Sequence, residues 1–165
     1  MASAFRILGE GQLSLTKFLL LTDTPRDLSD FRGLLEHLLA RFHPETDLYV
    51  FANLSMDTLD YSGPEVNKGS KGVMLGLGEA HRELPREWRG ELPAGARDPH
   101  VFCAGCLVIG GPRHEEDKDF AARIAAAPAF ADWPLVVCGG LLGLLVLVIT
   151  PVERVIHNRR KTDPQ

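Results

Sequence analysis

The chain has 165 residues, of which 45% are apolar and 24% charged. This composition is typical of a soluble globular protein and excludes a mostly disordered or collagen-like chain. The chain has 18 Lys and Arg residues and 22 Asp and Glu residues, so its formal charge is −4. It therefore lacks the positive excess of a general nucleic-acid binder. The 3 cysteines are too few for a disulfide framework and indicate a reducing cytoplasm.

The first part of the chain predicts a strand, a helix and a second strand. Residues 16–21 (TKFLLL) form a short apolar run before a turn, which is typical of a buried strand. Thr24 is then expected to cap a helix whose apolar residues recur on one face as far as Phe42. A second strand is predicted at 48–52 (LYVFA). Because the connections are short, the two strands are expected to be parallel with a right-handed crossover, and the predicted fold class is α/β, an open, mostly parallel sheet flanked by helices.

The middle and second part of the chain predict a long loop and further elements. Residues 53–78 are rich in Gly, Ser, Asp and Asn and are expected to form a loop with one apolar burst at 72–77. Loops beside strand ends are where open α/β sheets bind ligands. Residues 81–93 (HRELPREWRGELP) are polar and broken by proline, so they are expected to be surface or loop. The remaining predicted elements are two strands, within 101–109 and 133–137, and a helix over 117–127.

An uncharged stretch, residues 135–150, lies between two prolines near the C-terminal end. A membrane-spanning helix needs about 20 apolar residues, so this stretch is short for one. We favour a buried strand over 135–137 that runs into a packed apolar segment, and keep membrane contact through 135–150 as the alternative. The predicted organisation is an N-terminal extension over 1–12, an α/β domain over 13–137, and a divergent tail, apolar and then basic, over 138–165.

The string GSKG at 69–72 is the strongest candidate binding motif. Small residues let backbone N–H groups approach an anion closely, and the Lys71 side chain adds a positive charge. That combination suits a phosphate group. The alternative is a solvated turn, because exposed lysines beside glycines commonly have no other role.

Other residues with reactive side chains have structural explanations. Cys103 and Cys106 form one C-x-x-C pair, whereas a structural zinc needs four ligands, so two small semi-buried thiols are favoured. Asp57 and Asp60 could bind a metal, but capping and turn hydrogen bonds explain them as well. The charged residues within 83–87 could tune a proton-transfer group, yet a surface ion-pair network is favoured. No catalytic or metal-binding residue is therefore assigned.

Several strings that follow one another in the chain carry a family resemblance. They are LTKFLLLTD, MDTLDYSGPEVNKGSKG, RELPREW and FADWPLVV, of which LDYSGP, GSKG and REW are the most distinctive. Over roughly residues 9–137 the chain resembles the carboxy-terminal domain of the UbiD family, (de)carboxylases that use prenylated FMN. Many members of this family act on aromatic or α,β-unsaturated acids, including the polyprenyl-hydroxybenzoate step of ubiquinone biosynthesis.

The resemblance implies a role for the GSKG motif. In this family its lysine reaches the phosphate region of the cofactor, so Lys71 is expected to bind prenylated FMN there, with Gly69 and Ser70 forming the loop. The family's catalytic glutamate–arginine–glutamate set, and its ligands for Mn2+ and K+, lie upstream of the matching part. Residues 83–87 therefore inherit no catalytic role, and the tail at 138–165 departs from the family pattern.

The resemblance implies a part or small subunit of a UbiD-type carboxy-lyase that is inactive alone. It is expected to be located in the cytoplasm and not to bind nucleic acid. Its expected partner is a chain that carries the flavin-binding half, or further copies of itself in a homo-oligomer. A truncated or frameshifted gene, or a diverged subunit, would produce such a sequence. The alternatives are a non-catalytic binding or assembly module of the same descent, and a membrane-tethered variant that uses 135–150.

Overall fold

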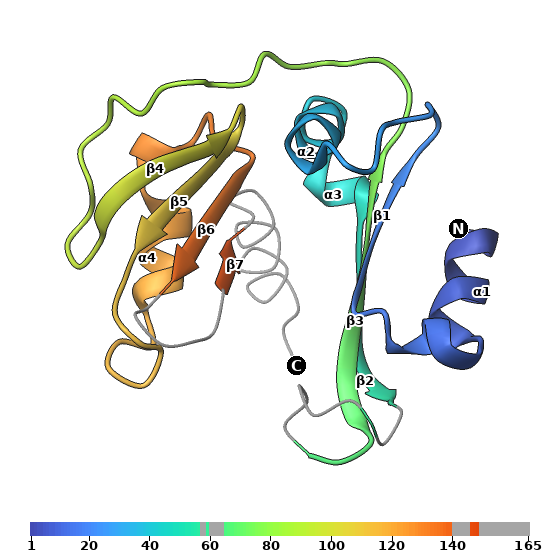
Figure 1. Cartoon of the computed structure of the whole chain (residues 1–165). Coiled ribbons are helices and arrows are strands. Elements are labelled where there is room, and N and C mark those ends of the chain that lie inside the picture. The colour runs from blue at the N-terminus through green and yellow to red at the C-terminus, as the bar shows by residue number, and fades with distance from the viewer. Residues whose placement is uncertain (57–58, 60–64, 140–145, 149–165) are drawn as a thin grey trace, which may run out of the picture.

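The computed structural model of the chain describes residues 1–56, 59, 65–139 and 146–148. Its helices and strands form two groups, each built around a small mixed sheet (Figure 1). The first group comprises α1 (Ala2–Gly9), η1 (Gly11–Leu15), β1 (Phe18–Thr22), α2 (Phe31–Leu39), α3 (Pro44–Asp47), β2 (Leu48–Ser55) and β3 (Lys68–Gly76). The second group comprises β4 (Arg97–Cys103), β5 (Cys106–Gly110), α4 (Phe120–Ala126), η2 (Pro128–Phe130), β6 (Leu135–Gly139) and β7 (Val146–Val148).

Helices and sheets alternate in layers (Figure 1). α1 packs on one face of the first sheet, where Leu8 is buried with Val73 of β3. α2 packs between the two sheets, since Leu39 is buried with Met74 of β3 and with Leu135 of β6. α4 covers the other face of the second sheet. This layered burial of apolar faces confirms the predicted α/β class.

The first sheet does not have the predicted strand arrangement. Its order is β1-β3-β2, with β1 parallel to β3 and β2 antiparallel to β3. The prediction that the strands before and after the helix are parallel was therefore wrong, because β1 and β2 run in opposite directions on the two sides of β3. The second sheet has the order β4-β5-β6-β7, in which β5 and β6 are parallel and the other two pairs antiparallel. Two small mixed sheets thus stand in place of the open, mostly parallel sheet.

The central strand β3 lies in the region that was predicted to be a loop. Residues 68–76 are all in the strand, so the GSKG motif belongs to a strand and not to a loop. The start of β3 is exposed, whereas residues 71–76 are buried. Backbone pairing with a strand on each side, together with this burial, outweighs the local turn preference of Gly and Ser.

Helix α2 begins later than predicted, because Asp30 caps it and Thr24 does not. The Asp30 carboxylate accepts a hydrogen bond of 2.9 Å from the Gly33 N–H. Asp27 accepts hydrogen bonds from the N–H and the hydroxyl of Ser29, at 2.9 and 2.7 Å, and so forms a turn before the helix. The predicted apolar face is confirmed in its second part, where the buried residues are Leu35, Leu38, Leu39 and Phe42. Leu28 and Phe31, which were predicted on the same face, are exposed.

The second sheet confirms the strands predicted within 101–109 and 133–137. β4 and β5 form a hairpin, and β6 lies parallel to β5 and is buried along its length. The favoured interpretation of 135–137 as a buried strand is confirmed. The strand predicted within 101–109 is β5, so β4 and β7 were not predicted. The rest of the tail lies outside the described residues. Within the described residues no helix is long and apolar enough to cross a membrane.

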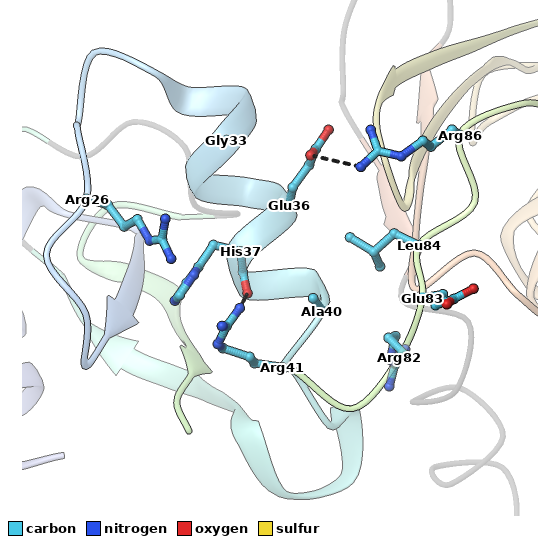
Figure 2. A pocket seen from close by; sticks show the side chains of 10 residues that line it. All are labelled: Arg26, Gly33, Glu36, His37, Ala40, Arg41, Arg82, Glu83, Leu84 and Arg86. Carbon is cyan, nitrogen blue, oxygen red and sulfur yellow. Dashed lines mark hydrogen bonds and ion pairs between the residues drawn. The ribbon is translucent and has the colours of Figure 1, made fainter. Parts of the chain in front are cut away.

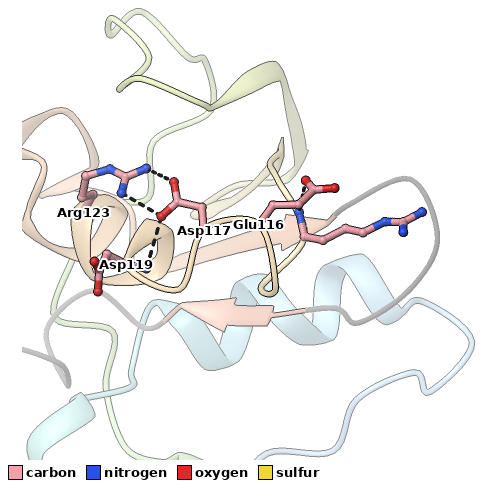
Figure 3. A network of polar contacts seen from close by, with 5 residues as sticks. Glu116, Asp117, Asp119 and Arg123 are labelled. Atoms are coloured by element: carbon pink, nitrogen blue, oxygen red, sulfur yellow. Dashed lines mark hydrogen bonds and ion pairs between the residues drawn. The ribbon is translucent and has the colours of Figure 1, made fainter.

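The predicted helix over 117–127 is confirmed as α4, which begins after an acidic turn (Figure 3). The Arg123 guanidinium donates hydrogen bonds to both carboxylate oxygens of Asp117, one of them at 3.0 Å. The Asp117 carboxylate also accepts a bond of 3.2 Å from the Asp119 N–H. The hydrogen bonds from Arg123 hold the pKa of Asp117 below its ordinary value. This network ties the turn to the helix, which gives it a structural role.

Residues 77–96 connect the two groups without a helix or a strand, as predicted for 81–93 (Figure 1). At the first group, the ring of His81 stacks on that of His43 with 3.6 Å between the centroids. At the second group, the ring of Trp88 stacks on Phe130 at 5.0 Å. The connecting segment is therefore held against both groups by ring contacts.

Candidate functional site

Lys71, the predicted phosphate ligand, is buried beneath the N-terminal segment. It is 6% exposed. Side chains alternate along a strand, so Lys71 points to the same face of β3 as Val73, the face that α1 covers. The Nζ ammonium donates a hydrogen bond of 2.5 Å to the Leu8 carbonyl oxygen and a second bond to the carbonyl oxygen of Ser14. Two of the three N–H donors of this ammonium are thus bonded to the backbone of α1 and η1.

This arrangement does not fit the phosphate of a flavin nucleotide. The two carbonyl oxygens carry partial negative charge and would repel an oxyanion at the Lys71 amine. Ser70 is exposed on the opposite face of β3. Gly69 is packed so closely that a Cβ there would lie 2.8 Å from Cγ of Met56. The three residues therefore do not converge on one cradle, and a phosphate contact of Lys71 would require residues 8–14 to move away.

The other candidate residues do not form a second chemical centre within the described residues. Cys103 and Cys106 are directly paired across the β4–β5 hairpin, and both are buried thiols outside any disulfide. A hydrogen bond with Cys106 and burial raise the pKa of Cys103, so its thiol stays protonated. Asp57 and Asp60 lie outside the described residues. Elsewhere the described residues contain no group of three or more His, Cys, Asp or Glu side chains that could hold a metal.

A cavity that no motif indicated lies between α2 and the connecting segment (Figure 2). Its volume is about 620 Å³, within the range of small-molecule sites. The positive side chains in its wall come from three separate parts of the chain and are Arg26, Arg41, Arg82 and Arg86. The negative ones are Glu36 and Glu83. Four positive charges against two negative ones leave the wall with an excess of two positive charges.

Hydrogen bonds to the backbone hold two of these arginines in the wall. Arg41 donates from Nε to the Gly78 carbonyl at 2.8 Å and from Nη1 to the His37 carbonyl at 3.0 Å. Arg82 donates from Nη2 to the Phe42 carbonyl at 3.0 Å, and burial lowers the pKa of its guanidinium. These hydrogen-bond partners are neutral carbonyl groups that orient the two guanidinium groups. Outside the wall, the carboxylate of Asp23 acts on the charge of Arg41 and that of Glu45 acts on the charge of Arg82.

One of the two carboxylates in the cavity is already engaged. Oε1 of Glu36 accepts a hydrogen bond of 2.8 Å from the Ala104 N–H, which joins α2 to the β4–β5 turn. Its Oε2 lies 4.0 Å from Nη2 of Arg86. Nearby, Nη2 of Arg89 lies 2.6 Å from a carboxylate oxygen of Glu87. The ion-pair network predicted for Glu83, Arg86 and Glu87 is thus found only in part, because Arg86 and Glu87 each pair with a residue outside this set.

The pKa of His37 responds to the positive charges of the cavity wall. The Nε2 atom of this buried side chain lies 2.9 Å from the hydroxyl oxygen of Thr22. Burial lowers the pKa of His37 below its ordinary value, and the charges of Arg41 and Arg26 lower it further, while Asp23 acts in the opposite direction. The imidazole is therefore expected to be neutral at pH 7.

Replacing Arg26 by alanine is expected to raise the pKa of His37 toward the ordinary value of about 6.5, because it removes a charge that disfavours the imidazolium. Since the folded-state pKa lies below the unfolded value, the free energy of unfolding of the wild type should fall as the pH drops below about 6.5, and Arg26→Ala should reduce that loss. NMR titration of the His37 ring measures the shift. Arg89→Ala, at a side chain 83% exposed and outside the cavity wall, is the matched control. An equal His37 pKa in all three proteins would contradict this prediction.

Sequence reasoning missed the cavity because its wall combines residues of the RELPREW string with residues that lie far from that string in the chain. One local signal was available, since Arg41 follows His37 by four residues and such residues share one face of a helix. Arg26 and Arg82 lie in segments without regular structure, and only folding brings them to α2.

Comparison with known proteins matches this chain to one family. Residues 1–76 match the family model described as the 3-octaprenyl-4-hydroxybenzoate carboxy-lyase C-terminal domain. An uncharacterized protein of Chlamydia caviae is 47% identical over 137 residues, which are 83% of this chain and 23% of that protein. A Chlamydia pneumoniae protein named as a subunit of 4-hydroxybenzoate decarboxylase is 44% identical over 137 residues, again 83% of this chain and 23% of that protein. The chain thus spans less than a quarter of the length of these relatives, and the matches confirm the resemblance that the motifs indicated.

Proposed function

Since this chain carries a C-terminal domain of the UbiD family over residues 1–76, we propose that it is a part or small subunit of a UbiD-type carboxy-lyase. The match of these residues to a carboxy-lyase domain carries the proposal. The name of the Chlamydia pneumoniae relative, a 4-hydroxybenzoate decarboxylase subunit, supports an aromatic acid as substrate. The proposed substrates are aromatic or α,β-unsaturated carboxylic acids, with polyprenyl-hydroxybenzoate of the ubiquinone pathway as one candidate, and the proposed location is the cytoplasm.

The cofactors of the proposed enzyme are prenylated FMN, Mn2+ and K+, held by a second chain that carries the flavin-binding half. Lys71 is bonded to backbone carbonyls, and no cluster of possible metal ligands occurs among the described residues. We therefore assign no catalytic step to this chain. Alone it is expected to be inactive.

A chimeric enzyme tests the proposal. In the Chlamydia pneumoniae relative, the 137-residue segment that matches this chain is replaced by the corresponding residues of this chain. The chimera, supplied with prenylated FMN and Mn2+, is expected to release CO2 from 4-hydroxybenzoate, whereas the isolated chain under the same conditions is expected to release none. Decarboxylation is followed by the loss of substrate absorbance, and circular dichroism confirms that each protein is folded. Turnover by the isolated chain, or a folded chimera without turnover when the parent enzyme is active, would contradict the proposal.

The burial of Lys71 favours one alternative, a non-catalytic binding or assembly module of the same descent. In that case the Lys71 amine serves to hold α1 and η1 on the sheet and never meets a flavin. The alternative predicts that adding the chain leaves the flavin-dependent activity of its partner unchanged. The carboxy-lyase proposal predicts that the partner's activity depends on the chain.

A further inference from the structure

The arginine-lined cavity is separate from the GSKG motif, although residues of the RELPREW string form part of its wall. Its wall is made by the segment before α2, by one side of α2 and by the connecting segment, and Lys71 is not part of it. The labelled side chains of Arg26, Arg41 and His37 lie on one side of the cavity, and those of Arg82 and Arg86 come from the segment that passes α2 (Figure 2). Neither the family match nor the proposed function accounts for this cluster.

The guanidinium groups keep donors that the protein does not use. A guanidinium has five N–H donors, of which the described contacts engage two in Arg41 and one in Arg82. Arg86 has a single carboxylate, at 4.0 Å, and Arg26 acts on His37 through its charge. The planar guanidinium group of arginine can donate two parallel hydrogen bonds to the oxygens of a phosphate or carboxylate group. An oxyanion in the cavity would therefore find several donors and a net positive charge.

The wall also limits the kind of ligand. Among the described residues that line the cavity none is Phe, Tyr or Trp, so there is no large aromatic surface on which a nucleotide base or a flavin ring could stack. The apolar part is small, with Leu84 as its largest side chain. A compact ligand with more than one negative charge fits this chemistry better than an aromatic one does.

We propose that this cavity binds a compact phosphate-bearing anion, with Arg41 and Arg82 as fixed donors in the wall and Arg26 and Arg86 as exposed donors that close on the phosphate. Bidentate guanidinium–phosphate contacts supply most of the affinity. Because the cavity is open to solvent at Arg26 and Arg86, a Kd of about 0.1–1 mM at low salt is expected.

Calorimetric titration of the full chain with pyrophosphate, inorganic phosphate, glucose 6-phosphate and FMN tests the proposal. Pyrophosphate is expected to bind more tightly than inorganic phosphate. The affinity for glucose 6-phosphate shows whether the cavity prefers a phosphate ester or a free phosphate anion as its ligand. Arg26→Ala and Arg86→Ala are each expected to weaken pyrophosphate binding about fivefold to tenfold. Arg89→Ala, which removes the same charge outside the cavity wall, should change it less than twofold.

A second readout locates the anion at the cavity. Saturating pyrophosphate is expected to raise the pKa of His37, because a nearby negative charge favours the imidazolium. The His37 titration of the same protein without pyrophosphate serves as the reference. The proposal would be overturned by equal weakening of pyrophosphate binding in Arg26→Ala and Arg89→Ala, or by an unchanged His37 pKa at saturation. It would also be overturned if FMN bound more tightly than the three non-aromatic phosphates.

Discussion

Replacing Lys71 by methionine is expected to lower the free energy of unfolding by about 2–4 kcal/mol, because buried carbonyl groups lose their charged hydrogen-bond donor. The Lys71 ammonium holds the carbonyl oxygens of Leu8 and Ser14, and the residue is 6% exposed. Methionine keeps most of the volume of the side chain, so the loss reports the ammonium and not a cavity. Protection of the amides of α1 and η1 from hydrogen exchange is expected to fall more than that of β5 or β6.

Urea denaturation of Lys71→Met and of a matched variant measures this effect. Lys68→Met removes the same charge from the same strand, at a side chain that is 64% exposed and paired with Glu65 at 2.7 Å. A surface ion pair of this kind contributes less than about 1 kcal/mol, so this variant should unfold near the wild-type midpoint. Equal midpoints for Lys71→Met and Lys68→Met would contradict the structural role of Lys71 and favour a contact of its amine with a cofactor phosphate.

Replacing Gly76 by alanine is expected to destabilise the chain by about 2–4 kcal/mol, because the new methyl group meets backbone that cannot move aside. Gly76 ends β3 on the face that packs against α2. A Cβ at this position would lie 2.7 Å from Cα of Leu38 and 2.4 Å from its Cδ2. Relief of this clash requires α2 to shift away from the sheet, which disturbs the core that both sheets share with it.

Gly72→Ala is the matched control in the same strand. A Cβ at Gly72 would lie 2.3 Å from Cε2 of Phe18, but only side-chain atoms are close, and Phe18 is 40% exposed. The ring can therefore rotate into solvent, and a cost below about 1 kcal/mol is expected. Urea midpoints of the two variants test the difference, and equal destabilisation would show that α2 adjusts as easily as an exposed ring.

Short-range patterns predicted most of the elements of this chain. The apolar runs indicated β1 and β2 to within a few residues, and the alanine-rich stretch indicated α4. These predictions succeeded because burial of one face imposes a spacing that is visible in the sequence. The start of α2 was missed because Thr24 and Asp30 are both good capping residues, and the choice between them depended on the turn that Asp27 makes with Ser29.

The order of the strands could not be predicted in the same way. The glycines and polar residues at the start of β3 favour a turn locally, yet this segment is the central strand of the first sheet. Its pairing partners lie far away in the sequence, so no local window contains the interactions that determine it. The same limit explains why the GSKG motif was placed in an open loop, whereas Lys71 is buried under α1.

By itself the sequence determined the composition class, most of the elements and the family, because each of these depends on residues that are close together in the chain or on strings that can be compared directly. The tertiary structure alone decided that Lys71 faces two backbone carbonyls and that Arg26, Arg41, Arg82 and Arg86 surround one cavity. Both arrangements depend on which face of a strand or helix meets which remote segment. That choice is made by the packing of the whole core, whose contacts join residues that no sequence spacing relates.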